Sequence, residues 1–364
     1  MTGRLRVLHV ITSLDVGGAQ RHLLSLARGL RSRGHLADVA FFKNPSLARQ
    51  FREAGIQLFD MTARGTISPL LLPRLVRRLR AGRYQIVHTH LLKADTYGAL
   101  AGVLAGTPVR VSSKHNDEQV LRRAGVAALH GLVSRLSHRV VVLSDHVGRY
   151  MASVGRVDPS RITRIYYGLP ATHAASPEQG HRLRRELGLP PEAPVVATVG
   201  RLAEQKGLTY LLEAMAIVRE RLPEARLLVV GDAQDGREGY KRELLRAREA
   251  LGLEESVIFT GNRDDVPAVM QACDLFLEAM AAARPVVATA VSAVPEVVQD
   301  GVTGLLVPPR NPRALAESML ALLSDRQRAE QMGAAGLRRL QEQFTEDAMV
   351  GSVERLYFQL WRDH

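Results

Sequence analysis

The sequence of 364 residues is long enough for two domains, since domains average about 150 residues. Hydrophobic residues make up 46% and charged residues 24%, which excludes an intrinsically disordered chain, and no apolar run reaches the ~18 residues of a membrane-spanning helix. The single cysteine, Cys273, excludes an internal disulfide and a thiolate metal cluster. Without a signal-peptide pattern near residue 1, we expect a cytoplasmic protein.

Positive charge is concentrated in the first half of the chain. Residues 1–170 contain 26 basic and 9 acidic side chains, whereas residues 171–364 contain 23 basic and 28 acidic ones. A basic surface attracts anions, so this half favours peripheral contact with the inner face of an anionic membrane or with an anionic acceptor carrier. The alternative explanation for the positive charge is that it lies on ordinary solvated helix faces and binds no partner. Nucleic-acid binding is not expected, because aromatic residues, which stack on bases, are only 5% of the chain.

Short apolar runs alternate with helical patterns along the whole chain, which is typical of βαβ units on a parallel sheet. In the first half we expect helices such as 21–33 and 73–81 between strands. The expected strands are 7–11, 37–42, 56–60, 86–89, 109–113, 140–143 and 162–165. Residues 1–170 therefore predict one doubly wound domain.

Residues 169–180 interrupt the alternation with Pro170, Pro177 and Gly180, so we interpret them as a linker. After them the pattern resumes, with expected strands at 195–199, 226–230 and 257–260 and expected helices at 208–221, 237–251, 312–323 and 326–344. Residues 171–344 thus predict a second doubly wound domain, and a helix at 345–364 is expected to pack back on the first. Ligands of such sheets bind outside the carboxyl ends of the strands, so two facing domains would hold a ligand between them.

Two loops at strand ends carry residues suited to anions. Gly17 and Gly18 follow the first strand, where glycine lets a backbone approach a ligand at a helix N-terminus, although a tight turn explains them equally well. Gly200, Arg201 and Lys206 follow the strand at 195–199, and both cations can face a diphosphate. Solvated loop charges are the alternative.

Histidines follow two of the expected strands. His88 and His90 have the spacing of metal ligands, but two ligands do not make a site, and no metal is expected. His115 lies just beyond the strand at 109–113. No arrangement of nucleophile and base is evident that would indicate covalent catalysis.

These motifs occur in the order found in glycosyltransferase family 4, retaining enzymes of the GT-B fold, and the chain resembles that family over nearly its whole length. The resemblance rests on Gly17-Gly18-Ala19, His88-Thr89-His90, Lys114-His115, Ser144-Asp145, Gly200-Arg201-Leu202, Lys206-Gly207, Val230-Gly231-Asp232, Gly261 and the segment from Glu278. It implies an α/β fold of two doubly wound, Rossmann-like domains facing across a cleft. It also implies transfer of a sugar from a nucleotide-diphosphate sugar to a hydroxyl of a glycan, lipid-linked carrier or small molecule, with retention and without cofactor or metal.

The resemblance assigns roles to individual residues. It implies that Arg201 and Lys206 bind the donor diphosphate and stabilise the leaving group, and that His115 contacts the donor sugar near the reacting carbon. These three are the expected catalytic residues. The remaining expected donor-binding residues are Gly17, Gly18, Gly200, Glu278, which would bond the ribose hydroxyls, and Glu296.

The sequence departs from the family between Leu277 and Glu278, where relatives carry a glycine-rich loop with the first of two paired glutamates. Eight residues, 278–285, remain between two expected strands, and a parallel crossover usually needs about 10–12. Either residues 266–283 form one continuous helix and the strand at 274–277 is lost, or the enzyme carries an internal deletion. Both predict impaired turnover. The alternatives are a catalytically inactive nucleotide-sugar-binding or scaffold protein and another GT-B chemistry such as sugar-nucleotide epimerisation.

Overall fold

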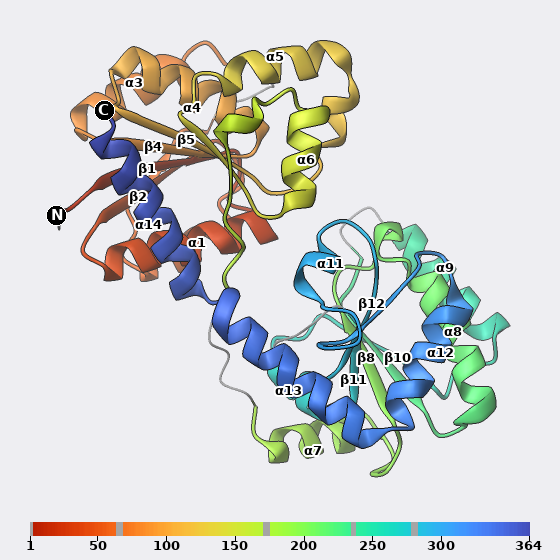
Figure 1. Ribbon diagram of the computed structural model, residues 1–364. Coiled ribbons are helices and arrows are strands. Elements are labelled where there is room, and N and C mark those ends of the chain that lie inside the picture. The colour runs from red at the N-terminus through yellow and green to blue at the C-terminus, as the bar shows by residue number, and fades with distance from the viewer. Residues whose placement is uncertain (1–2, 63–67, 170–174, 234–237, 278–282) are drawn as a thin grey trace. The chain divides into compact units, whose positions relative to one another are not determined.

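The structure is a computed structural model that describes residues 3–62, 68–169, 175–233, 238–277 and 283–364. The chain divides into two compact units. Unit 1 comprises residues 1–170 and 343–364, and unit 2 comprises residues 171–342. Each contains a parallel β-sheet with helices packed on it (Figure 1), which confirms the predicted α/β class with two doubly wound sheets. Among the described residues, none of the helices combines the length and the apolar character needed to span a bilayer.

The sheet of unit 1 has seven parallel strands in the order β3-β2-β1-β4-β5-β6-β7. The strands are β1 (Arg6–Ile11), β2 (Leu36–Phe41), β3 (Leu58–Asp60), β4 (Ile86–His90), β5 (Val109–Lys114), β6 (Arg139–Val142) and β7 (Ile162–Arg164). Every strand expected in this half is present, with ends that differ by at most two residues.

Helices cover both faces of this sheet. They are α1 (Gly18–Ser32), α2 (Ala48–Glu53), α3 (Leu71–Ala81), α4 (Leu92–Ala105), α5 (Ala124–Ser134), α6 (Asp145–Ser153) and the C-terminal α14 (Glu346–Arg362). Successive side chains of β1 point to opposite faces of the sheet and so pack in different hydrophobic cores. Val7 packs with α1 and α14, whereas Leu8 packs with α3 and α4.

The C-terminal helix α14 completes unit 1. It lies against α1 so closely that a Cβ on Gly29 would stand 2.5 Å from Cγ2 of Val350. Tyr357 of α14 is fully buried, and the Glu354 carboxylate binds both Arg33 and His35. The last helix of the chain is therefore part of the first core.

Unit 2 has a six-stranded parallel sheet in the order β10-β9-β8-β11-β12-β13. Its strands are β8 (Val195–Val199), β9 (Arg226–Val230), β10 (Val257–Gly261), β11 (Leu275–Leu277), β12 (Val286–Thr289) and β13 (Leu305–Val307). Its helices are α7 (Pro177–Glu186), α8 (Leu208–Arg221), α9 (Glu238–Ala250), α10 (Val266–Ala272), α11 (Val294–Val297), α12 (Pro312–Leu323) and α13 (Arg326–Gln343). One core lies under α8 and α12, and another lies under α7 and α10.

One expectation for this half is wrong, and one of the two alternatives for the segment near Leu277 is excluded. The linker predicted over 169–180 ends too late, because α7 begins at Pro177 behind a capping box made by Ser176 and Gln179, which satisfies N–H groups that a helix end otherwise leaves unpaired. A continuous helix over 266–283 does not form. Instead α10 ends at Ala272, and β11 pairs with β8 on one side and β12 on the other.

Candidate functional site

In unit 2, the loops that follow β8 and β9 touch at the carboxyl edge of the sheet. Gly231 has φ +126°, and a Cβ there would stand 2.0 Å from the carbonyl oxygen of Gly200, so only glycine fits. The Leu202 amide donates to the carbonyl of Asp232 at 3.1 Å. The Lys241 ammonium, 2.8 Å from Asp232, lowers the pKa of that carboxyl. The loop that carries Gly200 and Arg201 is therefore held in place by its neighbour.

The predicted cations lie on this loop. Arg201 and Lys206 are both exposed, and Lys206 ends a 3₁₀ turn before Gly207, which takes φ +61° as the N-cap of α8. The Lys206 chain folds back towards Gly200, since a Cβ on that glycine would lie 3.7 Å from Cε of Lys206. The structure thus places Gly200, Arg201 and Lys206 together at a strand's carboxyl end.

A pocket of about 260 Å³ opens beside Lys206 at the same edge of the sheet. It lies at the N-termini of α8 and α12, where free N–H groups and the helix dipole favour anions. Arg310 lines it as a second cation, and Thr289 and Asn311 add polar groups. Sequence analysis missed Arg310, although a cation directly before an Asn-Pro helix start was a usable signal.

Of the two predicted glutamates, the structure describes only Glu296. Glu278 lies outside the described residues. Glu296 is half-buried on α11, where Nη2 of Arg339 donates to its backbone carbonyl at 2.8 Å, and it does not appear among the described residues that line the pocket. The expected donor-binding role of Glu296 stays a prediction.

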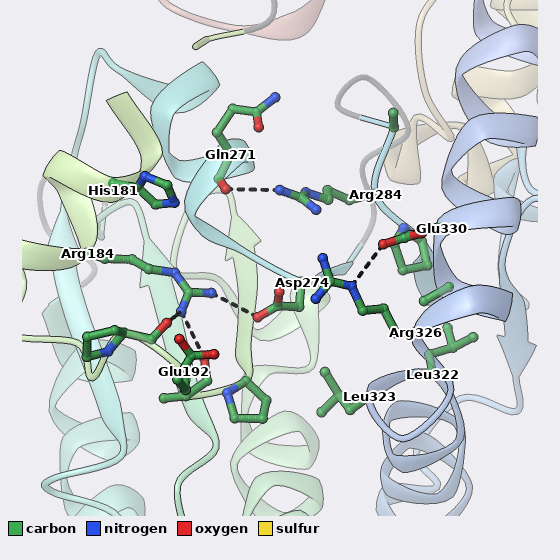
Figure 2. Close-up of a pocket in the computed structure, with 16 residues that line it drawn as sticks. His181, Arg184, Glu192, Gln271, Asp274, Arg284, Leu322, Leu323, Arg326 and Glu330 are labelled. Carbon is green, nitrogen blue, oxygen red and sulfur yellow. Dashed lines mark hydrogen bonds and ion pairs between the residues drawn. The ribbon is translucent and has the colours of Figure 1, made fainter. Parts of the chain in front are cut away.

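A larger pocket of about 430 Å³ lies at the opposite, amino ends of β8, β11 and β12 (Figure 2). Its charges pair within the pocket. Arg184 binds Asp274 at 2.9 Å and Arg326 binds Glu330 at 2.9 Å, while Arg284 donates to the carbonyl of Gln271. Because ligands of open parallel sheets bind at the carboxyl ends, the smaller pocket is the better candidate for a ligand site.

The two glycines of the loop after β1, Gly17 and Gly18, differ in the space beside their Cα atoms. Gly17 has an extended backbone and caps α1, and a Cβ there would stand 2.6 Å from Oε1 of Gln20. Gly18 has no atom within 4 Å of a Cβ position, so a ligand can approach its backbone. The ligand contact predicted for these glycines stays a prediction at both, with open space beside Gly18 and the end of the flexible Gln20 side chain beside Gly17.

A chain of imidazoles runs through the sheet of unit 1 to the predicted His115. His9 Nδ1 lies 3.1 Å from His90 Nε2, and His90 Nδ1 lies 3.1 Å from His115 Nε2. His115 Nδ1 in turn bonds the hydroxyl of Tyr167, which follows β7. The ring of His22, on α1, stacks on Tyr167 with centroids 4.2 Å apart. Sequence analysis singled out His88, His90 and His115 separately but gave no signal that they join.

His88 forms a separate branch. Its Nε2 lies 2.7 Å from the Ser113 hydroxyl and its Nδ1 lies 2.5 Å from the Tyr357 hydroxyl. Ligand atoms of His9, His88 and His90 come within 4.8 Å of one another, close to the span of a metal site. Both ring nitrogens of His88 and His90 already hold hydrogen-bond partners, however, so the arrangement suits a hydrogen-bonded core.

Burial lowers the pKa of these histidines. The pKa values of His9 and His22 fall to about 3, and those of His88, His90 and His115 fall well below the ordinary value, because an imidazolium loses its hydration and repels its neighbours. All five imidazoles are therefore neutral near pH 7, and each holds one N–H hydrogen.

Comparison with known proteins identifies the family. Residues 16–173 match the family described as Glycosyltransferase Family 4, and residues 181–339 match Glycosyl transferases group 1. A phosphatidyl-myo-inositol mannosyltransferase of Mycobacterium leprae is 30% identical over 358 residues, 90% of each chain. The protein is a family 4 glycosyltransferase. A D-inositol 3-phosphate glycosyltransferase of Corynebacterium aurimucosum is 32% identical over 75% of this chain and 65% of its own.

The fold of this glycosyltransferase is also that of solved GT-B enzymes. HepE of Anabaena, solved in complex with UDP, superimposes with a TM-score of 0.89 at 24% identity, over 98% of this chain and 100% of its own. The two family matches contain the Gly17–Gly18 loop and the Arg201–Lys206 loop respectively. The glycosyltransferase identity and the GT-B architecture expected from the sequence are thus confirmed.

Proposed function

We propose that this glycosyltransferase takes a sugar from a nucleotide-diphosphate donor and transfers it to a hydroxyl acceptor with retention of the anomeric configuration. The observation that carries the proposal is the pocket beside Lys206, where two cations and two helix N-termini meet at the carboxyl edge of the sheet. HepE, which has the same fold, was solved with UDP, which supports a nucleotide donor.

The chemistry follows from where charge develops. As the glycosidic bond breaks, negative charge grows on the leaving diphosphate, and Arg201, Lys206 and Arg310 supply positive charge there without a metal. The acceptor hydroxyl attacks from the side that the diphosphate leaves and passes its proton to the departing phosphate oxygen, so the configuration is kept without a protein nucleophile. A glycan, a lipid-linked carrier or a small molecule provides that hydroxyl.

Nucleotide binding by the unmodified protein and by Lys206→Ala tests the donor site. With UDP and GDP as probes in calorimetry, loss of the Lys206 contact should weaken binding by about 1.5–3 kcal/mol, the contribution of a charge-assisted hydrogen bond. Arg310→Ala should act in the same direction, and Lys43→Ala, an exposed lysine in unit 1, is the control. If Lys206→Ala and the control bind UDP and GDP with equal affinity, Lys206 does not contact the nucleotide.

We propose further that unit 1 contacts anionic lipid on the inner face of the membrane. Arg74, Arg77 and Arg80 are exposed on α3, whereas Leu71, Leu75 and Leu79 are buried. Helix α5 contains no charged residue but leaves Leu129 56% and Leu132 62% exposed. Arg122, Arg123 and Arg135 flank it. An apolar strip framed by arginines suits the boundary between headgroups and acyl chains.

Vesicle co-sedimentation tests this contact. The protein should bind phosphatidylglycerol vesicles more than phosphatidylcholine vesicles, and added salt should release it because screening weakens the attraction. Leu129→Ser combined with Leu132→Ser should reduce binding, whereas Leu251→Ser, at a 38% exposed leucine of unit 2, should not. Equal recovery on both lipids at low salt would contradict the proposal.

The short connection between β11 and β12 is the feature on which the inactive alternative rests, whereas the family matches support the enzyme. These strands are parallel neighbours, yet only residues 278–285 join them. A panel of nucleotide sugars distinguishes the two functions, because an enzyme transfers or hydrolyses one of them, whereas an inactive binding protein only binds.

A further inference from the structure

A pocket of about 750 Å³ lies in unit 1 beside the C-terminal end of α14, away from the residues discussed so far. Its apolar lining comes from Leu5, Phe358 and Trp361, and the Phe358 ring packs on the core of the unit. Gln85 and Gln359 add two amide groups. Every lining residue belongs to unit 1, so this unit forms the pocket by itself.

Three exposed arginines also line this pocket. They are Arg4, before β1, and Arg355 and Arg362 of α14. No carboxylate is among the described lining residues, and none of the described carboxylates forms an ion pair with these arginines. Asp363 follows Arg362 in the sequence but does not line the pocket. The pocket therefore combines positive charge with an apolar surface, and an anion would supply the charge that is missing.

Trp361 indicates which kind of anion the pocket suits. It is the only tryptophan of the sequence, and it is 37% exposed. Tryptophan is enriched where the headgroups of a membrane meet its apolar interior, and the planar guanidinium of arginine matches a phosphate group. A free phosphate would contact the arginines but not the apolar lining. A phospholipid has a partner for both.

The pocket lies at the same edge of the sheet as the ends of α3 and α5, the helices that we propose to meet lipid. Nε of Arg6, which begins β1, donates to the carbonyl of Gly82, directly after α3, at 2.7 Å. The ring of His364, beyond α14, lies 6.2 Å from the ring of His138, which lies between α5 and β6. These three helices therefore all end at the amino edge of this sheet.

We infer that the pocket at the end of α14 binds the phosphate of an anionic phospholipid through its three arginines, while the Trp361 ring lies at the boundary with the acyl chains. The inference rests on the proposed contact of unit 1 with anionic lipid and adds a defined site to it. Unit 1 then meets the membrane with the amino edge of its sheet. The carboxyl edge, with Gly18 and His115, faces away from the lipid, so the phospholipid held here is an anchor and not the acceptor.

The fluorescence of Trp361 tests the site directly, because no other tryptophan contributes to the signal. Phosphatidylglycerol vesicles should shift its emission to shorter wavelengths, and bromine atoms on their acyl chains should quench it. Phosphatidylcholine vesicles and inorganic phosphate should do neither. A shift with inorganic phosphate equal to that with the vesicles would assign the pocket to a free phosphate and overturn the inference.

Paired variants test the arginines. Arg4→Ala combined with Arg362→Ala should weaken binding to phosphatidylglycerol vesicles about thirtyfold in co-sedimentation. Arg313→Ala combined with Arg328→Ala removes the same charge from exposed positions of unit 2 and should leave binding unchanged. Equal melting temperatures exclude a folding defect, and equal vesicle binding by the two double variants would contradict the inference.

The same measurements separate this site from the membrane contact on which it rests. If the vesicles sediment the unmodified protein but leave the emission of Trp361 unchanged, the contact through α3 and α5 stands and the site at α14 fails. If the vesicles do not sediment the protein, both fail.

Discussion

Lys114 Nζ lies 2.6 Å from Asp95 Oδ2, and both side chains are about 95% buried, with 5% and 4% exposed. Thr89 and Ser112 donate their hydroxyls to the other carboxylate oxygen. This ion pair joins the end of β5 to α4, directly before His115. The buried ammonium of Lys114 and the buried carboxylate of Asp95 therefore neutralise each other, and both oxygens of the carboxylate accept hydrogen bonds.

Lys114→Met should destabilise the protein by about 3–5 kcal/mol, because it leaves a buried carboxylate without its cation. Chemical denaturation measures the change. Lys43→Met, at an exposed lysine, should alter stability by less than about 0.5 kcal/mol. A similar small effect at Lys114 would mean that water replaces the ammonium.

Acid should unfold the protein through its neutral histidines. Their folded pKa values lie below the unfolded value of about 6.5, down to about 3 for His9 and His22, so the unfolded chain binds more protons. The stability is fully present above about pH 7 and is lost as the pH falls below about 6.5, by up to ~1.4 kcal/mol per pH unit for each histidine.

Urea unfolding at pH values of about 8, 6 and 5 measures that slope. His22→Gln should reduce the slope by about 1 kcal/mol per pH unit, and Leu251→Ser, which removes no titratable group, should leave it unchanged. A flat stability between pH 8 and pH 5 would show that the cluster protonates in the folded state.

Ala283→Gly should stabilise the protein by about 0.5–1 kcal/mol. Ala283 has φ +53°, a left-handed conformation that strains any residue with a Cβ. Ala128→Gly, within the exposed face of α5, should destabilise by about 1 kcal/mol, because its conformation is helical. Thermal unfolding of the two variants should therefore shift in opposite directions.

Chelators should affect neither melting temperature nor nucleotide binding. The buried histidines bond one another, Ser113 and Tyr357, and the proposed donor site relies on Lys206 and arginines. Dialysis against EDTA, followed by addition of Zn²⁺, measures this. A rise in melting temperature on adding Zn²⁺ would instead indicate a metal held by His9, His88 and His90.

Insertion of a family-like glycine-rich segment, with its Pro-Ser and Glu-Gly-Phe-Gly, after Leu277 should raise turnover with little effect on UDP affinity. The segment would bring donors to the sugar end of the ligand, where each such group contributes about 10²–10³ in rate. The longer connection should also raise the melting temperature, since eight residues are short for a parallel crossover. Full turnover in the unmodified protein would show that the protein does not need this segment and that another group, such as Glu296, contacts the sugar.

Both sheets could be predicted from the sequence because their buried strands are short apolar runs, as at β1 in unit 1 and β8 in unit 2. Residues 305–307 and the helix after Ser176 were missed, because three residues give no period and the capping box was read as part of a linker. In the site, the strand-end loop with Arg201 and Lys206 was predictable from its neighbours in sequence. The pairing of His9 with His90 was not, since 81 residues separate them and only the sheet register joins them.

The placement of α14 has a consequence for synthesis on the ribosome. Residues 171–342 emerge complete and can fold while the chain is still growing, but the first sheet must wait for the last helix to cover its face. Until then the partner of His88, Tyr357, has not been made, and the apolar residues of α1 that pack on Val350 stay open to solvent. The part of the protein that is translated first therefore completes its core only after the residues of α14 have been made.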